Sequence, residues 1–184
     1  IRGKHRSRTI GSLRDETRYL ASKGVKEIIL IAQDLTWYGR DIYGKQLLAP
    51  LLEQLSDVQG VEWIRLHYAY PASFPEDVLQ VMRNRSNICR YLDIPLQHVS
   101  DHILRSMRRG IDGKETRVLV EKLRKEVPGL ALRTTMLVGY PGETEKDFQE
   151  LMQFVYESRF ERLGVFVYSP EEGTASFGMA DDVP

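Results

Sequence analysis

The chain has 184 residues, of which 42% are hydrophobic and 28% are charged, a size and composition typical of one compact domain with a substantial core. Basic and acidic residues number 26 each, so the overall charge does not indicate a nucleic-acid or membrane partner. No apolar run approaches the roughly 18 residues of a membrane span, and the chain does not open with a signal peptide. The single cysteine, Cys89, excludes a disulfide framework and a cysteine metal cluster built from this chain alone, and it fits a reducing, cytoplasmic compartment.

The chain begins without methionine and ends at 181–184 with no finished element, so we expect it to be a piece of a longer protein. Its start carries a dense basic run: Arg2, Lys4, His5, Arg6 and Arg8. Two interpretations stay open for this run, a solvated arm or a contact with a phosphate, a carboxylate or RNA.

The elements that follow alternate regularly between helix and strand. Ser12 is a candidate cap for a first helix that ends at Gly24. Further helices are predicted at 47–55, 75–83, 102–108, 115–127 and 146–158. Short apolar or β-branched runs predict strands at 25–32, 63–67, 91–96, 132–138 and 163–168. Five strands separated by helices predict a parallel α/β sheet with right-handed crossovers, either open or closed into a barrel or partial barrel.

The stretch from Leu132 to Glu145 is a strand, a glycine-rich turn and the start of a helix for which Thr144 is a candidate cap. Such a turn brings backbone N–H groups and a helix N-terminus together, which favours a small anionic or polar ligand. Arg133 lies inside this strand, where burial would require an anionic partner from ligand or protein.

In parallel α/β proteins, ligands bind beyond the carboxyl ends of the strands. Every predicted strand exit here carries hydrogen-bonding or aromatic groups, which indicates an enzyme core. The groups at these exits are Gln33, Asp34, His67, Tyr68, Tyr70, Gln97, His98, Gly139, Gly142, Glu143, Tyr168 and Ser169.

Structural roles are the alternative for several of these residues. Gln33 and Asp34 can cap the next turn, His67 and His98 can be neutral structural histidines, and the two glycines can serve a tight turn alone. Cys89 is interpreted as a buried apolar residue just before a strand. The sequence contains no catalytic triad, zinc-ligand spacing or Walker loop.

Several motifs, taken in order, resemble the radical S-adenosylmethionine methylthiotransferases. They are Arg2–Arg8 (RGKHRSR), Gly24–Ile28 running on to Ala32-Gln33-Asp34 and Tyr38-Gly39, Tyr91–His98 (YLDIPLQH), Met107–Gly110 (MRRG), Val138–Thr144 (VGYPGET), and Tyr168-Ser169 with Gly173-Thr174-Ala175. The resemblance spans essentially the whole chain. The form Asp93–His98 (DIPLQH) is most similar to the branch that modifies a ribosomal protein, and the tRNA-modifying branch is the near relative.

The resemblance implies a partial (β/α)6 TIM-like barrel of the radical SAM type, here lacking its first strand. Residues 1–184 would be a fragment of this core barrel. The upstream loop with the CxxxCxxC cluster ligands, an N-terminal domain and a downstream TRAM domain would lie outside it. The implied cofactors are S-adenosylmethionine and 4Fe-4S clusters, and the fragment by itself is expected to bind no cluster and to be inactive. The strand at 25–32 is expected to expose an unpaired edge.

The same resemblance implies nine cofactor-binding positions and no catalytic or metal-binding residue. Gln33 and Asp34 would contact the methionine amino group, and Arg133 its carboxylate. Gln97 and His98 would lie near the ribose, and Val138, Gly139, Gly142 and Tyr168 near the adenine.

The implied reaction starts with reductive cleavage of S-adenosylmethionine to a deoxyadenosyl radical. In the ribosomal-protein branch, that radical abstracts hydrogen from the β-carbon of an aspartate, and a methylthio group is added. The implied partners are that ribosomal protein, an electron donor, and the ribosome or RNA through a TRAM domain, with no membrane. Two alternatives stay open: methylthiolation of tRNA adenosine, and a cofactor-free α/β barrel that acts as a binding module.

Overall fold

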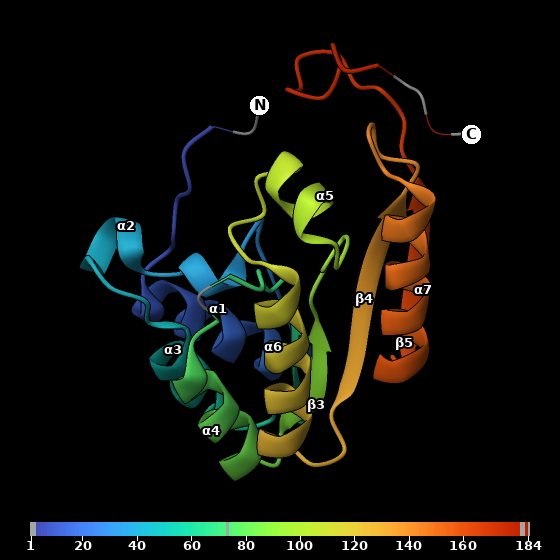
Figure 1. The fold of residues 1–184 in the computed structure, drawn as a ribbon. Helices are drawn as coiled ribbons and strands as arrows, with labels where there is room; N and C mark the ends of the chain where they lie inside the picture. Colours follow the sequence, from blue (N-terminus) through green and yellow to red (C-terminus); the bar gives the residue numbers. More distant parts are fainter. Residues whose placement is uncertain (1–2, 73, 181–182, 184) are drawn as a thin grey trace.

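The computed structural model describes residues 3–72, 74–180 and 183, so Arg2 of the basic run and the end residues 181, 182 and 184 lie outside the described part. Its five strands are β1 (Glu27–Ile31), β2 (Trp63–His67), β3 (Ile88–Asp93), β4 (Ala131–Val138) and β5 (Arg162–Val167). All are parallel and stand in chain order across one curved sheet (Figure 1). The predicted alternating α/β class is confirmed, and the arc is that of a partial barrel.

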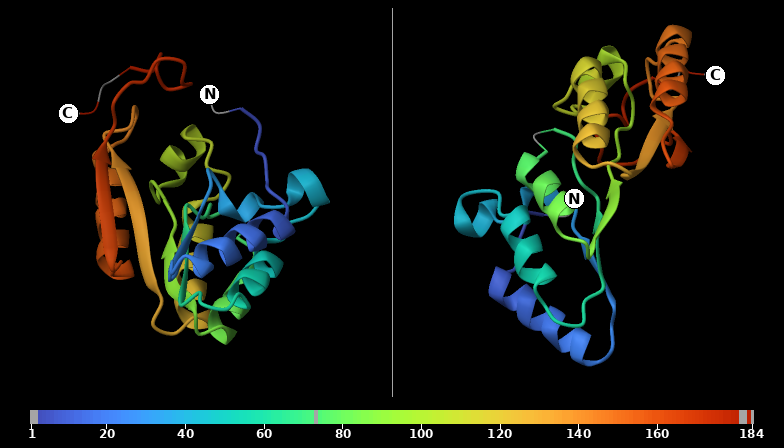
Figure 2. Two further views of the ribbon diagram at one scale, coloured as in Figure 1. Left: turned by 180° about the vertical axis from the view of Figure 1, so that it is seen from behind. Right: turned by 90° about the horizontal axis from the view of Figure 1, so that it is seen from below.

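The helices lie along the convex side of this arc, as the view from below shows (Figure 2, right). The helices are α1 (Ile10–Ser22), α2 (Arg40–Tyr43), α3 (Leu48–Ser56), α4 (Glu76–Asn84), α5 (Asp101–Ser106), α6 (Gly113–Glu126) and α7 (Glu145–Ser158), with a 3-10 turn η1 (Leu35–Trp37). No helix in the described ranges is long and apolar enough to cross a membrane.

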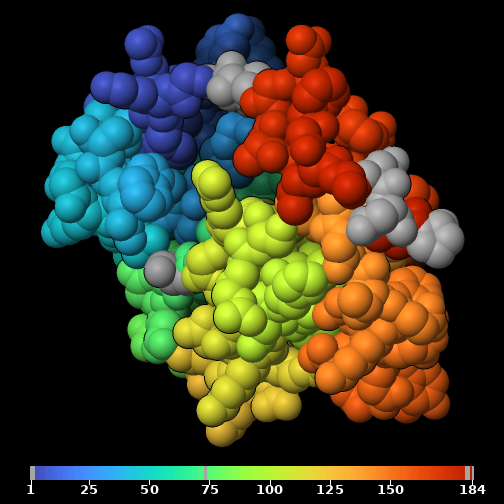
Figure 3. Space-filling model, turned by 45° about the horizontal axis from the view of Figure 1, so that its top comes forward, coloured from blue at the N-terminus to red at the C-terminus, as the bar shows by residue number. Residues whose placement is uncertain are grey.

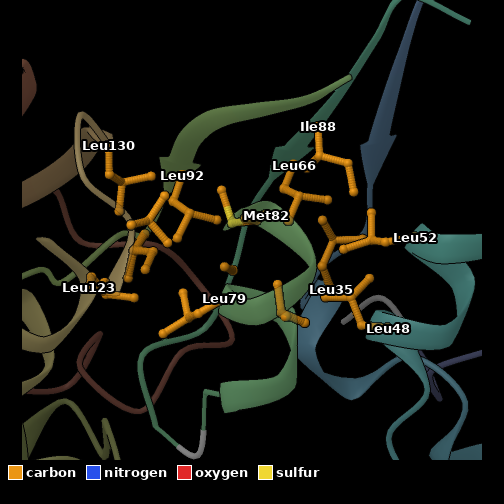
Figure 4. Close-up of a cluster of buried hydrophobic side chains, with 14 of the residues drawn as sticks. Leu35, Leu48, Leu52, Leu66, Leu79, Met82, Ile88, Leu92, Leu123 and Leu130 are labelled. Atoms are coloured by element: carbon orange, nitrogen blue, oxygen red, sulfur yellow. The ribbon is translucent and has the colours of Figure 1, made fainter. Parts of the chain in front are cut away.

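Side chains on the convex side of the sheet form the core with the helices. Ile64, Leu66 and Leu92 are buried there. Figure 4 shows Leu66 and Leu92 facing leucines from α3, α4 and α6. Because successive strand residues point to opposite faces, the alternate residues line the concave side. There Ile29 and Ile31 of β1 are largely exposed. Among the described strands β1 pairs only with β2, so the open edge predicted for this strand is present.

Several element boundaries differ from the sequence predictions. The first helix is capped by Thr9, whose hydroxyl accepts the N–H of Ser12. Ser12, the predicted cap, lies inside the helix. β3 runs from Ile88 to Asp93 rather than from 91 to 96. Ile94 still donates to the Arg133 carbonyl. Pro95 follows and has no N–H to continue such a ladder.

Two helices also begin or end elsewhere than predicted. Gly113 does not precede the helix predicted at 115–127 but opens it, because Asp112 and Glu115 form a reciprocal capping box. A Cβ at Gly113 would lie 2.1 Å from the Val99 carbonyl oxygen, so only glycine fits there. Helix α5 ends at Ser106, short of the predicted 108, and the Ser100 hydroxyl does not cap it but donates to Asp147. Thr144 caps α7 as predicted, through a second capping box.

Both ends of the chain come to the carboxyl edge of the sheet. The segment after Tyr168 crosses above the ends of β4 and β5, and residues 3–9 pass the end of β1 (Figure 1). The arm is partly anchored, since Tyr38 donates to the Arg8 carbonyl (2.8 Å) and Ser7 accepts from the Gly39 N–H (3.1 Å). From above, these end segments flank the part of the chain around α5 (Figure 3).

Candidate functional site

The carboxyl edge separates the predicted site residues into groups. Gln33 and Asp34 follow β1 at one side of the sheet, whereas Val138, Gly139 and Tyr168 follow β4 and β5 at the other. Gln97 lies between them, because its backbone forms an isolated bridge with Met136 of β4. The sheet therefore brings the β4 and β5 groups together with Gln97 and keeps the β1 pair apart from them.

The glycine-rich turn after β4 is closed by Glu143. Its Oε2 accepts the N–H of Gly139 (2.5 Å) and of Tyr140 (3.2 Å), and its side chain is almost fully buried. Gly139 and Gly142 both have positive φ angles, +72° and +84°, which favour glycine. Because a carboxylate of the chain already binds these two N–H groups, the turn does not offer them to a phosphate. The turn at 139–143, called the wall below, is thus held in shape by the chain itself and is not an anion-binding site.

His98 holds the same turn from behind. It is fully buried; its Nδ1 accepts the Ser100 N–H (3.0 Å), and its Nε2 lies 3.4 Å from Glu143 Oε1. One accepting and one donating nitrogen correspond to a neutral imidazole, and burial lowers the pKa of His98 despite the opposing effect of Glu143. His98 is therefore a buried histidine whose two ring nitrogens both have partners within this chain, as its structural alternative predicts. A direct contact of His98 with a ribose stays a prediction.

A cavity of about 350 Å³ lies beside this wall. It is lined by Val138 and Gly139, by Phe148 of α7, by Val167 of β5, and by Glu143, Thr144, Glu145 and Val183. Tyr168 donates its N–H to the Val138 carbonyl (2.8 Å) and packs edge-on against Tyr140 at 5.3 Å between ring centroids. A mostly apolar cavity of this size with backbone groups at its rim fits a nucleoside. This observation makes the residues after β4 and β5 compatible with the adenosyl part of S-adenosylmethionine.

Asp34 serves the turn that follows β1. Its Oδ1 accepts from the N–H (2.8 Å) and the hydroxyl (2.6 Å) of Thr36 and caps η1. The capping alternative is thus confirmed for Asp34, while Gln33 beside it is exposed. Contacts of either residue with an amino group stay predictions.

The concave face of the sheet carries a chain of polar contacts that the sequence analysis largely missed. Arg65 binds Glu27 (2.6 Å) and lies over the Tyr91 ring at 5.0 Å. Asp93 is fully buried, and its Oδ2 lies 2.8 Å from Arg133 and 3.8 Å from His67 Nδ1. Its Oδ1 is buried without a hydrogen-bond partner in the described part. The sequence signal that could have indicated these contacts is the alternation of side chains in the strand 63–67 (WIRLH), which places Arg65 and His67 on the same face.

Arg133 therefore has the anionic partner that its position required, and the chain supplies it as Asp93. Binding of a methionine carboxylate by Arg133 stays a prediction.

Cys89 differs from expectation: it lies within β3 on the concave side and is only partly buried, although burial still raises the pKa of its thiol. Within the described residues, no group of three or more His, Cys, Asp or Glu side chains could hold a metal ion. These residues do not fit an iron–sulfur cluster.

The class of protein follows from a comparison with family models. The model of the Radical SAM superfamily matches residues 1–155, and the chain therefore belongs to this superfamily. The superfamily implies S-adenosylmethionine and a 4Fe-4S cluster as cofactors.

Solved structures show the same fold. Coproporphyrinogen III oxidase from Escherichia coli, a radical SAM enzyme, has a TM-score of 0.69 at 19% identity, over 95% of this chain and 41% of its own. Streptococcus suis SuiB bound to S-adenosylmethionine has a TM-score of 0.65 at 14% identity, over 97% of this chain and 38% of its own.

The curated relatives are more specific. Ribosomal protein uS12 methylthiotransferase RimO of Bacteroides fragilis is 58% identical over 185 residues, which cover all of this chain and 43% of the relative. The protein of the same name from Cytophaga hutchinsonii is 58% identical over 184 residues, again all of this chain and 42% of the relative. The chain thus spans less than half the length of these relatives.

Proposed function

We propose that this chain is the barrel core of a radical SAM methylthiotransferase whose substrate is ribosomal protein uS12. The observation that carries the proposal is the identity of 58% over the whole chain with a protein of that name. The modified position would be the β-carbon of an aspartate, as the sequence resemblance implies. The nearest alternative within the class is methylthiolation of tRNA adenosine.

The proposal assigns residues 1–184 to the core barrel and places the CxxxCxxC loop and the flanking domains in the rest of the longer protein. The length of the relatives supports this assignment. When bound, the two cofactors supply the radical chemistry, and the protein supplies binding, orientation and exclusion of water. Reading the sequence upstream of Ile1 is the first test, and a CxxxCxxC close to that residue is expected.

The residues of this chain would act as a binding frame. Val138, Gly139 and Gly142 would pack the adenine, with Tyr168 fixing the edge of the wall through its backbone. Gln97 would face the ribose, and Gln33 and Asp34 the methionine amino group. Glu143 and His98 would hold the wall in shape from the buried side.

The substrate is tested with the full-length protein, reconstituted anaerobically with its clusters. The protein is incubated with S-adenosylmethionine, a sulfur source and either uS12 or unmodified tRNA. Mass spectrometry is expected to find methylthio-aspartate in uS12 and no change in tRNA. Methylthio-adenosine in tRNA together with unmodified uS12 would overturn the proposal.

A further inference from the structure

The turn after α5 brings one arginine into the interior of the protein. Arg108 has a positive φ angle of +55°, a conformation usually supplied by glycine at the end of a helix. Arg109 follows, and its N–H donates to the Leu104 carbonyl (3.0 Å). Its Nε is buried without a hydrogen-bond partner, and it forms no ion pair with a described carboxylate; burial lowers the pKa of its guanidinium. Because burying an unpaired charge is costly, a residue in these surroundings is a candidate for a functional role.

Arg109 and Tyr70 join two loops that leave neighbouring strands. The Arg109 guanidinium lies over the Tyr70 ring, 4.7 Å from the ring centroid, and its Nη2 donates to the Pro95 carbonyl (2.7 Å). In return, the Tyr70 hydroxyl donates to the Arg109 carbonyl (2.6 Å). Tyr70 belongs to the loop after β2, and Pro95 to the loop after β3. These contacts, called the arginine clamp below, thus tie both loops to the turn after α5.

Each of the two loops carries a residue with a strained backbone. Tyr68, directly after β2, has a φ angle of +63°, and Gln97, after β3, has one of +73°. Such left-handed conformations are unfavourable for residues with a Cβ, and they persist where the surroundings fix them, often beside ligand sites. Tyr68 precedes Tyr70 by two residues, and Gln97 follows Pro95 by two. Both strained residues therefore lie next to a contact of the arginine clamp.

The neighbouring segments also hold the backbones of the two strained residues. The Tyr68 carbonyl accepts the N–H of Leu35 (3.0 Å). Gln97 donates its N–H to the Thr135 carbonyl (2.8 Å), and its own carbonyl accepts the N–H of Leu137 (2.8 Å). The arginine clamp adds a link between the two loops beyond the ends of their strands. The conformation of Gln97 is thus fixed from β4 on one side and from the arginine clamp on the other.

We propose that Arg109 is a positioning residue of the S-adenosylmethionine site, where the arginine clamp holds Gln97 in the conformation that faces the nucleoside. This role rests on the proposed function, which places Gln97 beside the ribose. A guanidinium suits the role because its flat face stacks on an aromatic ring while its N–H fork donates in a fixed direction. A lysine carries the same charge but neither the plane nor the fork.

The test measures S-adenosylmethionine affinity by calorimetry in the full-length, anaerobically reconstituted protein. The thermal unfolding midpoint of each variant is the second readout. Arg109→Met removes the guanidinium and is expected to lower the affinity about tenfold. Tyr70→Phe keeps the ring against Arg109 but removes the hydroxyl, and about a threefold loss is expected. This milder variant keeps the test decisive if Arg109→Met does not fold.

Arg124→Met is the matched control. Arg124 also has a buried Nε without a partner in the described part, and it donates to the Ser158 and Arg159 carbonyls. Its ion-pair partner, Glu161, directly precedes β5, so Arg124 lies at the opposite edge of the sheet from the strand exits. Arg124→Met is expected to lower the thermal unfolding midpoint at least as much as Arg109→Met and to leave the affinity unchanged.

A double-mutant cycle measures whether Arg109 acts through Gln97. Gln97→Gly removes the side chain and relieves the strain, because glycine adopts a positive φ angle readily. If the arginine clamp serves Gln97, it has no side chain left to position in this variant. Adding Arg109→Met to Gln97→Gly is therefore expected to change the affinity by less than about twofold.

Three outcomes would overturn this role of Arg109. The first is a loss of affinity in Arg109→Met no larger than in Arg124→Met, and the second is a full Arg109 effect that persists beside Gln97→Gly. The third is complete recovery by Arg109→Lys, which would show that the charge alone acts. Failure of the proposed function is a separate result: the wild-type protein would then bind S-adenosylmethionine without methylthiolating uS12. The affinities of the variants would still decide the role of Arg109.

Discussion

The two faces of the same sheet differ in burial and in the kind of side chain they carry. On the convex face, Ile64, Leu66 and Leu92 are no more than 1% exposed and pack against helices. On the concave face, their chain neighbours Arg65 and Tyr91 are partly exposed and belong to the polar chain that ends at Arg133. One-residue steps along a strand thus separate a packed apolar face from a partly exposed polar face. Stability should depend more on the first face than on the second.

The largest expected difference between the faces is between two adjacent residues of β4. Met136→Ala removes a side chain that is 1% exposed and should lower the free energy of unfolding by about 2–5 kcal/mol. Thr135→Ala, one residue away on the concave face, should change it by less than about 0.5 kcal/mol. Urea unfolding monitored by circular dichroism measures both. Equal losses would show that the concave face is also a packing surface.

The turn after β4 should behave like the convex face, although it borders the cavity of about 350 Å³. Glu143→Ala leaves the N–H groups of Gly139 and Tyr140 without their acceptor and should cost about 2–3 kcal/mol. Glu145→Ala is the control, because this exposed side chain binds only the Gln149 side-chain amide in the described part, and less than about 0.5 kcal/mol is expected. A Glu143 variant as stable as the control would show that Glu143 is not needed to hold this turn in a fixed conformation.

Within the concave face, the two register partners should differ. Arg133→Gln removes the partner of the fully buried Asp93 and should cost about 1–3 kcal/mol. Arg162→Gln removes a group with no described ion-pair partner and should stay within about 0.5 kcal/mol. Thermal unfolding of the two variants side by side measures the difference. A destabilised Arg162 variant would indicate a structural role for this side chain as well.

The smallest effect concerns pH. Burial lowers the pKa of His98 in the folded state below its ordinary value of 6.5, so the unfolded chain takes up a proton first as the pH falls. The stability that the neutral histidine contributes is therefore present above about pH 6.5 and is lost as the pH falls toward the folded-state pKa. His98→Asn should reduce this loss, measured by urea unfolding between about pH 5 and 7.5. His102→Asn, at an exposed position, should retain it.

The strand and helix pattern was readable because it depends on local periodicity. The run 63–67 is a strand with the predicted ends, and Thr144 caps α7 through a capping box that involves Asp147. Element boundaries that depend on contacts with other parts of the chain could not be predicted from local periodicity. β3 ends at Asp93 because the chain leaves the ladder before Pro95, and Gly113 is required by the carbonyl of Val99 from a preceding loop.

Among the candidate site residues, the sequence by itself determined which groups stand at each strand exit. Parallel strands with alternating crossovers must place their carboxyl ends on one edge, and the motif set pointed to the superfamily that the comparisons show. Only the tertiary structure decided which groups are free. Glu143 and the turn it binds come from one motif, but His98 reaches it across 45 residues, and Asp93 reaches Arg133 across 40. Such contacts depend on strand order, register and burial, which local patterns do not contain.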